Sequence, residues 1–405
     1  MKITWGPNGP SDGMDAPFKV AIVGVGIISG IGNSKEDFWK GLFGPAPVGM
    51  RTVDDFDPSL WLGPKEIRRH DRFNQFGIAA ASLALEDAGD LQITDPGRAG
   101  VLVGTGVGGL ESLETQVMVG NTRGFDRVTP FLVPLMMANA GAASISMRFG
   151  LEGPCETTVT ACAAGTQAIG NAARMIASGR CDVMFTGGSE CAMTETAKAG
   201  FRNMTAMSNA GISRPFDKNR DGFMMGEGAA ILILEELERA KARGAHIYAT
   251  IDGAASNADA YHITAPRPHG IGAAACMQLA IDDAGLIPSD IAHINAHGTS
   301  TPMNDLAEGE AMNRVFGQTT PPVTSVKGAL GHSFGSAGAL EAVAACLTIE
   351  HRIIPPTVGT KDIDPDIHVD VVMHEGRPFA PGPIISNSFG FGGHNGSIII
   401  SPYQN

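Results

Sequence analysis

Two segments of the chain, one in each half, combine an expected strand, a turn of small residues and a helix rich in alanine and glycine. They span residues 157–179 and 324–350. A helix without a polar face must be buried on all sides. Each of these helices therefore needs a layer of structure above and below it, which favours a duplicated unit with the two helices between two sheets. We expect a five-layer α-β-α-β-α architecture built from two similar halves.

The rest of the chain alternates short apolar segments with longer helical patterns. Such alternation predicts an α/β protein whose sheets are covered by helices. We expect a leader at residues 1–17, flexible because it is rich in Pro and Gly, then an N-terminal half at 18–250 and a C-terminal half at 251–405. The expected strands are 18–26, 99–109, 182–188, 229–236, 248–255, 291–298 and 383–390, and the expected helices are 73–89, 236–246, 272–285 and 306–317.

Composition excludes several classes of protein. With 29 basic and 42 acidic residues the net charge is −13, which disfavours nucleic-acid binding. The long uncharged segment 128–147 is interrupted by Pro130 and Pro134, so no membrane insertion is expected. Six irregularly spaced cysteines contain no CxxC pair, which disfavours zinc and disulfides. Reduced thiols predict a cytoplasmic protein.

Cys162 stands apart from the other cysteines because a helix is predicted to begin beside it, in the segment VTACAAGTQAIG. The free N–H groups at a helix N-terminus can stabilise a thiolate or bind an oxyanion. The other five cysteines are expected to be small, buried apolar residues. Cys162 is therefore the candidate nucleophile.

Two histidines and a lysine also follow expected strands. His297 lies in NAHGTSTPMND, and Lys327 and His332 lie in SVKGALGHSFGSAGALE. The ends of strands are where α/β proteins place their chemistry. A nucleophilic cysteine with two histidines can perform acyl transfer, although spacing alone does not bring them together. The glycine-rich segment NSFGFGGHNG either approaches a ligand closely or closes the last hairpin.

Taken in order, five segments resemble the β-ketoacyl-acyl-carrier-protein synthases. The resemblance is to the type II elongating enzymes of bacterial fatty-acid synthesis and their polyketide relatives, and it covers residues 18–402. The matching blocks are 159–170, 214–229, 295–305, 325–341 and 387–396. The resemblance implies a thiolase fold and a homodimer, or a heterodimer with a ketosynthase-like partner.

The resemblance also implies residue roles. Cys162 would carry the acyl chain as a thioester, and His297 and His332 would act in malonyl decarboxylation. Lys327 matches the family lysine, and Glu341 matches the glutamate paired with it.

Further family positions match residues that would contact substrate or carrier. The N–H groups of Cys162 and Phe389 would form the acyl oxyanion hole, Phe389 would gate the site, and Phe223 would face malonyl. The remaining matches are Thr299 and Thr301 at the phosphopantetheine arm, Val107 at the acyl tunnel, Phe391 at the substrate, and Lys65, Arg68, Arg69 and Arg127 at the carrier protein.

The implied activity is a decarboxylative Claisen condensation in fatty-acid elongation. Both substrates would arrive on the 4′-phosphopantetheine of acyl carrier protein, and no metal or redox cofactor is expected. The alternative is a catalytic ketosynthase of a type II polyketide or polyene pathway. A chain-length factor is disfavoured because such subunits lack the nucleophile. His394 replaces the common threonine of the GGTN block, which leaves chain length and pathway open.

Overall fold

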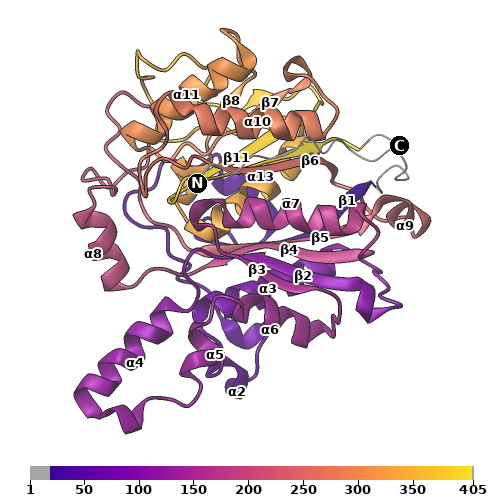
Figure 1. Cartoon of the computed structure of the whole chain (residues 1–405), viewed down its shortest axis with the longest axis vertical. Helices are drawn as coiled ribbons and strands as arrows, with labels where there is room; N and C mark the ends of the chain where they lie inside the picture. The colour runs from indigo at the N-terminus through magenta and orange to yellow at the C-terminus, as the bar shows by residue number, and fades with distance from the viewer. Residues whose placement is uncertain (1–18, 404–405) are drawn as a thin grey trace, which may run out of the picture.

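A computed structural model of the chain describes residues 19–403. The expected leader, residues 1–17, lies outside the described residues. Figure 1 shows the N-terminal half, in indigo to magenta, below the C-terminal half, in orange to yellow. Each half contains a five-stranded part of one large sheet.

The first half orders its strands β3-β2-β4-β5-β1. The pairs β3·β2 and β2·β4 are parallel, whereas β4·β5 and β5·β1 are antiparallel. All these strands except β3 consist almost entirely of buried residues, as expected for a sheet covered on both faces. The strands span Val20–Ser29 (β1), Ala99–Gly104 (β2), Cys155–Thr158 (β3), Val183–Glu190 (β4) and Gly228–Glu236 (β5).

The second half repeats this arrangement in the order β8-β7-β11-β12-β6. Again two parallel pairs, β8·β7 and β7·β11, precede two antiparallel pairs, β11·β12 and β12·β6. The repeat supports the proposal that the halves divide near residue 250. The strands span Ala249–Ala258 (β6), His293–Asn295 (β7), Val323–Thr324 (β8), Ile384–Gly390 (β11) and His394–Ser401 (β12).

The two halves are joined through the backbone. Three residues of β1, Val20–Ile22, pair with Ala249–Ile251 of β6. The sequence predicted two separate sheets, but this short antiparallel contact connects them into one ten-stranded ladder. The rest of β1 pairs only with β5, so the two parts diverge and leave room for helices between them.

The alanine-rich helices occupy the central layer, as expected. Helix α7 (Ala164–Ala177) packs on β4 and β2 and also on β12 and β6, while α13 (Ala337–His351) packs on β5, β4 and β11. Residues 337–348 of α13 are all buried. A Cβ on Gly165 would lie 2.9 Å from the carbonyl oxygen of Gly335, so the starts of the two helices touch. Small residues are therefore required where they meet.

Outer helices complete the five layers. Helix α3 (Arg72–Asp87) covers β1 and β5 with α6 (Ala140–Phe149) beside it, and α10 (Ile271–Asp283) covers β6 and β12 with α11 (Pro302–Phe316) beside it. The remaining elements are α1 (Lys35–Gly41), α2 (Pro64–Ile67), α4 (Leu110–Arg123), α5 (Leu132–Met136), α8 (Glu195–Asn203), α9 (Leu237–Ala242), α12 (Lys327–Leu330), β9 (Ile353–Ile354) and β10 (Arg377–Pro378). Over residues 19–403, none of the helices combines the length and apolarity needed to cross a bilayer.

Candidate active site

Cys162 lies where β3 turns into the central layer. The 3-10 turn η4 (Ala161–Ala163) carries it, and α7 begins two residues later. Ala161 adopts φ of 50°, a left-handed conformation that L-residues rarely take. Cys162 is 7% exposed. The prediction of a cysteine at a helix N-terminus is confirmed in position, with a short 3-10 turn in front of the helix.

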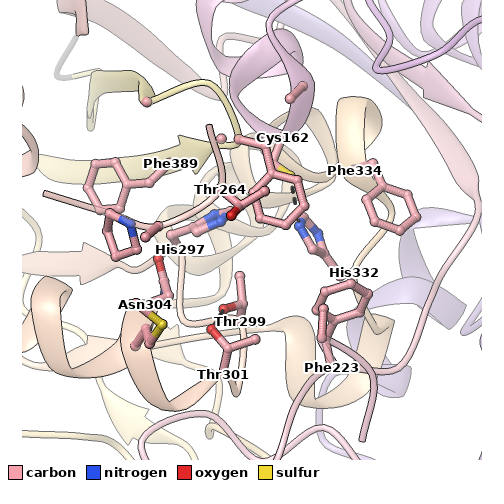
Figure 2. A pocket seen from close by; sticks show the side chains of 18 of the residues that line it. Cys162, Phe223, Thr264, His297, Thr299, Thr301, Asn304, His332, Phe334 and Phe389 are labelled. Carbon is pink, nitrogen blue, oxygen red and sulfur yellow. Dashed lines mark hydrogen bonds between the residues drawn. The ribbon is translucent and has the colours of Figure 1, made fainter. Parts of the chain in front are cut away.

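Both histidines approach this cysteine from the second half of the chain. His297 follows β7, and His332 follows the short helix α12. The His332 Nε2 atom lies 3.0 Å from the Cys162 sulfur, and Figure 2 shows this contact between the two side chains. The two imidazole rings are 5.4 Å apart, centre to centre. The structure therefore brings together the three side chains singled out in the sequence.

Lys327 fixes the protonation pattern of His297. The Lys327 ammonium lies 3.3 Å from His297 Nδ1 and forms a buried ion pair with Glu341. An ammonium can only donate hydrogen bonds, so Nδ1 of His297 accepts. The proton of this neutral imidazole is then on Nε2, where it is available as a donor.

Burial controls the charges in the site. It raises the pKa of Cys162 to about 12, against the opposing effects of the Lys327 charge and the Phe391 N–H. Burial, together with the charge of Lys327, also holds the pKa values of His297 and His332 well below their usual range. The sequence suggested a thiolate stabilised by a helix N-terminus, but desolvation outweighs that effect. The resting pair is a neutral thiol beside a neutral imidazole.

The oxyanion donors require one correction. Besides the N–H of Cys162 itself, the backbone N–H that faces the sulfur belongs to Phe391, where the sequence analysis expected Phe389. Phe389 is still within the strand ladder, paired with Asn395, whereas Phe391 lies in the turn after β11. The ring of Phe389 lies 5.8 Å from that of His297.

A pocket of about 500 Å3 contains these groups. Figure 2 shows Phe223, Phe334 and Phe389 around the two histidines, with Thr299 and Thr301 farther along the wall. The Phe223 ring stands edge-on to His332 at 5.2 Å. The hydroxyls of Thr299 and Thr301 are 2.9 Å apart. Every predicted substrate-binding residue lines this pocket: Val107, Thr299, Thr301 and Phe391.

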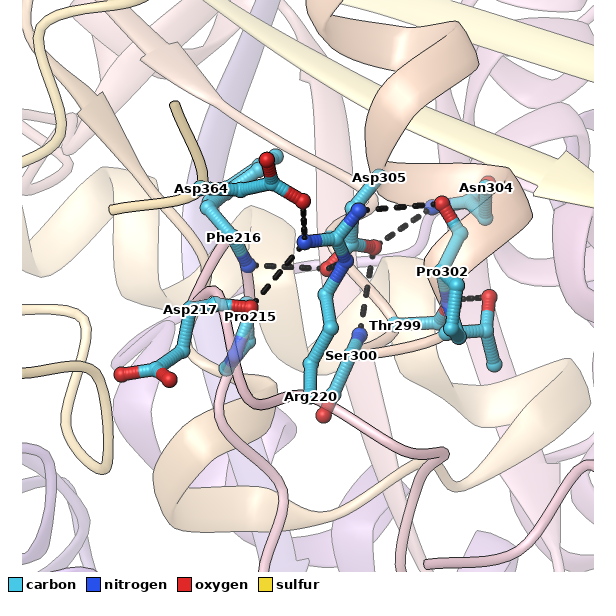
Figure 3. Close-up of polar contacts among 12 residues, drawn as sticks. Pro215, Phe216, Asp217, Arg220, Thr299, Ser300, Pro302, Asn304, Asp305 and Asp364 are labelled. Carbon is cyan, nitrogen blue, oxygen red and sulfur yellow. Dashed lines mark hydrogen bonds and ion pairs between the residues drawn. The ribbon is translucent and has the colours of Figure 1, made fainter. Parts of the chain in front are cut away.

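The loop that carries Thr299 and Thr301 is held by a buried ion-pair network, drawn in Figure 3. Arg220 lies between Asp305 and Asp364 and donates to the carbonyl oxygen of Pro302 at 3.1 Å. Asp305 in turn accepts from the N–H groups of Phe216 and Ser300. This network fixes the loop, so the two threonine hydroxyls have a defined place in the pocket wall.

Comparison with known proteins identifies the family. Residues 44–240 match "Beta-ketoacyl synthase, N-terminal domain", and residues 248–361 match "Beta-ketoacyl synthase, C-terminal domain". The chain belongs to the β-ketoacyl synthase family. It is 42% identical to 3-oxoacyl-[acyl-carrier-protein] synthase 2 of Synechocystis sp., covering 95% of this chain and 98% of that protein.

Solved structures agree with this assignment. The ishigamide ketosynthase/chain length factor superposes with a TM-score of 0.90 at 35% identity, covering 96% of this chain and 100% of that chain. A type II PKS acyl-carrier protein in complex with its ketosynthase gives 0.87 at 29% identity, again over 96% and 100%. The thiolase-like fold predicted from the sequence is therefore confirmed.

In this β-ketoacyl synthase, the predicted carrier patch is exposed. Lys65 lies in α2, and Arg68 and Arg69 follow it directly. The Arg69 guanidinium stacks over the Phe131 ring at 4.9 Å, which connects α2 to the segment containing Arg127. Arg127 has 71% of its side chain exposed. Their role in carrier binding stays a prediction.

Two buried carboxylates of the synthase were missed from the sequence. Glu308 accepts the N–H groups of His297 at 2.8 Å and Gly298 at 2.7 Å. Glu190 accepts those of Gly106 and Gly335, and so connects the two halves beside the pocket. Burial raises the pKa of each to about 7. Neither lies in a recognisable motif of chemistry, and only Glu190 left a signal, as an acidic residue at the end of a buried strand. Cys155, expected to be buried, is exposed because it lies on the edge strand β3.

Proposed function

We propose that the protein is a 3-oxoacyl-[acyl-carrier-protein] synthase of fatty-acid elongation, in which Cys162 holds the growing chain. The contact between His332 Nε2 and the Cys162 sulfur carries this proposal, because it gives a buried thiol a proton acceptor. The identity of 42% to a 3-oxoacyl-ACP synthase over nearly the whole chain supports the same reaction.

In the first half-reaction the Cys162 sulfur attacks the thioester carbonyl of the acyl carrier. The thiol proton passes to His332 and then to the departing carrier sulfur, so the histidine ends neutral. The negative oxygen of the tetrahedral intermediate is held by the N–H groups of Cys162 and Phe391, which both face the sulfur. The acyl chain then lies in the apolar part of the pocket near Val107.

In the second half-reaction the malonyl carrier enters and loses carbon dioxide. The electron pair of the broken C–C bond forms an enolate, whose oxygen accepts the Nε2–H of His297 and faces His332. A neutral donor suits this step, and burial keeps the His297 imidazole uncharged. The enolate carbon attacks the Cys162 thioester, and as the new C–C bond forms the sulfur leaves as a thiolate, which takes up a proton from water to restore the thiol. No metal or redox cofactor takes part.

Intact-protein mass spectrometry tests the proposal. Incubation with acyl carrier protein loaded with chains of graded length should add one acyl group, located on Cys162 by peptide mapping. The Cys162→Ala variant should lose both the adduct and condensation, whereas Cys276→Ala, at another buried free cysteine, should keep them. An adduct that persists in Cys162→Ala would disprove the nucleophile.

A polyketide ketosynthase is the second candidate, supported by the structural likeness to the ishigamide ketosynthase/chain length factor. The two candidates share all chemical steps described above and differ in the chains they accept. Turnover of saturated acyl chains of increasing length supports the fatty-acid assignment. Preference for chains that retain keto groups or double bonds would favour the polyketide or polyene pathway.

We propose that the partner subunit is a second copy of this chain. Strand β3 is at the edge of the sheet, with its outer side unpaired within the described chain. Exposed apolar side chains lie next to it and on the α4–α5 segment: Val159, Phe131, Val133 and Met137. An open strand edge beside an apolar surface favours pairing with another chain. Sedimentation equilibrium should give a dimer mass, and a monomer at micromolar concentration would refute this.

The carrier and the cell compartment complete the proposal. The carrier protein is expected to bind at the patch formed by Lys65, Arg68, Arg69 and Arg127, since acyl carrier proteins are acidic. We place the enzyme in the cytoplasm, where a reducing environment keeps the Cys162 thiol available. Fractionation of the source cells with an antibody against the chain would test the location.

A further inference from the structure

The pocket opens to the solvent along the start of α11. Thr299 is 5% exposed, and Met303, four residues later and also in the pocket wall, is 60% exposed. This side of the pocket therefore extends from the buried Cys162 thiol to the protein surface. A segment spanning 259–270 packs along α11: Gly270 lies against Ala307 and Ala311, and Arg314, in the last turn of the helix, donates to the His269 carbonyl oxygen at 2.8 Å. This segment and the start of α11 form the outlet of the pocket.

One cation stands at this outlet. Arg267 is the single lysine or arginine among the described residues that line the pocket, whose other charged side chains are the carboxylates Glu190, Asp259 and Glu308. Arg267 is exposed, and no ion pair or side-chain hydrogen bond is formed by its guanidinium within residues 19–403. The carboxylate of Asp259 is already engaged, because it accepts the backbone N–H of Arg267 and the amide of Asn395.

The backbone that carries Arg267 is fixed. Its N–H donates to Asp259 at 2.8 Å, and its carbonyl oxygen accepts from Gly270 at 3.1 Å. Upstream, the imidazole of His262 accepts the N–H groups of Thr264 and Ala265, both at 3.1 Å. The guanidinium therefore extends from a preorganised backbone, so only the Arg267 side chain has to be ordered when a ligand binds.

We propose that Arg267 binds the phosphate at the outer end of the pantetheine arm, and so makes the synthase select phosphorylated over unphosphorylated pantetheine thioesters. This inference rests on the proposed function, which brings substrates on 4′-phosphopantetheine. The arm would pass the hydroxyls of Thr299 and Thr301, and its single phosphate would then reach the outlet. Guanidinium groups bind phosphate through two parallel hydrogen bonds. In a chain of net charge −13, an anion at this opening requires a local cation.

The test compares two small thioesters that differ only in the phosphate: an acyl chain on pantetheine 4′-phosphate and the same chain on pantetheine. The rate of Cys162 acylation in wild-type enzyme should favour the phosphorylated compound about fivefold, the effect of one exposed charge-assisted contact. Arg267→Ala should remove the preference, and Arg267→Lys should retain part of it. The control Arg180→Ala removes an exposed charge beyond the far end of α7 and should leave the preference intact.

A binding measurement separates this inference from the proposed function. Calorimetric titration of unacylated enzyme with pantetheine 4′-phosphate and with pantetheine needs no turnover, and should show the same preference and its loss in Arg267→Ala. If wild-type enzyme forms no thioester on Cys162, the proposed function fails even where this preference holds. Three results would each overturn the phosphate contact. Arg267→Ala could lower the acylation rate equally for both compounds, it could keep the full preference for the phosphorylated compound, or it could affect only carrier-bound substrate.

Discussion

The imidazole of His293 should make the folded synthase sensitive to acid. His293 is in β7, 2% exposed, and neither of its ring nitrogens has a hydrogen-bond partner within the described chain. Burial lowers its pKa to about 3. The folded state thus excludes a proton that the unfolded chain binds near pH 6.5. Stability is therefore retained above pH 6.5 and is lost as the pH falls toward 3.

The magnitude follows from the shift. Between pH 6.5 and pH 5 the unfolded chain gains a proton that the folded chain lacks, which costs about 1.5 × 1.36, or ~2 kcal/mol, of unfolding free energy. Replacement by an apolar residue of similar volume, His293→Leu, removes this titrating group and its effect on stability. The difference in unfolding free energy between pH 7 and pH 5 should then shrink by about 2 kcal/mol relative to wild type.

Urea denaturation followed by tryptophan fluorescence at the two pH values measures this difference. The control is His368→Gln, at an exposed histidine, which should keep the wild-type pH dependence. Other buried groups titrate in the same range, but they are common to all three proteins and cancel in the comparison. If His293→Leu loses as much stability on acidification as wild type, protonated His293 is tolerated in the fold and the predicted acid sensitivity is refuted.

Three further predictions concern the site and its surroundings. His297→Ala should slow malonyl decarboxylation by about 10²–10³, as expected for one lost oxyanion donor, yet leave acylation of Cys162 largely intact. Release of carbon dioxide measures the decarboxylation, and the mass of the acyl-enzyme measures the acylation. An equal loss in both rates would assign His297 to activation of the thiol. Reversing Arg68 and Arg69 to Glu should raise KM for carrier-bound substrate several-fold and spare coenzyme A thioesters, and a similar loss with both would instead indicate a structural role. Arg220→Leu should destabilise the fold by about 3–5 kcal/mol in denaturant titration, because the buried carboxylate of Asp305 loses its cation. A loss of unfolding free energy below about 1 kcal/mol would refute this explanation.

The layering and the positions of Cys162, His297 and His332 at the ends of elements could be predicted from the sequence because each leaves a local signal, whereas their grouping in one site was implied only by the family resemblance. Alanine and glycine predominate in α7 and α13 and indicate burial, although α7 keeps Asn171 and Arg174 exposed, and the seven expected strands all exist. Glycine and small residues beside Cys162, His297 and His332 indicated the ends of elements. Such local patterns indicate the kind of residue and its place in the chain.

Features that depend on register or on distant partners could not be predicted in this way. The N–H that faces Cys162 belongs to Phe391 and not to Phe389, because the hairpin turn starts after Gly390. The sequence could not show this, since a shift of two residues replaces one Phe-Gly pair by the next. Strand β3 is short and exposed, so it lacks an apolar pattern. Glu308 accepts two N–H groups across ten residues or more, and nothing in its own neighbourhood indicates this.

The contact between the starts of α7 and α13 has a consequence for how the enzyme acquires activity. Cys162 is supplied by the turn before α7, and His332 by the segment between α12 and α13 in the second half. Cys162 and His332 are thus held by two similar motifs, one from each half, that contact each other. A nascent chain or proteolytic fragment that ends before β7 contains Cys162 but lacks His332. Acylation of Cys162 would therefore report that the two halves have come together. We expect a chain cut between the two halves to give two inert pieces. Their reassembly can be monitored by the return of the thioester on Cys162.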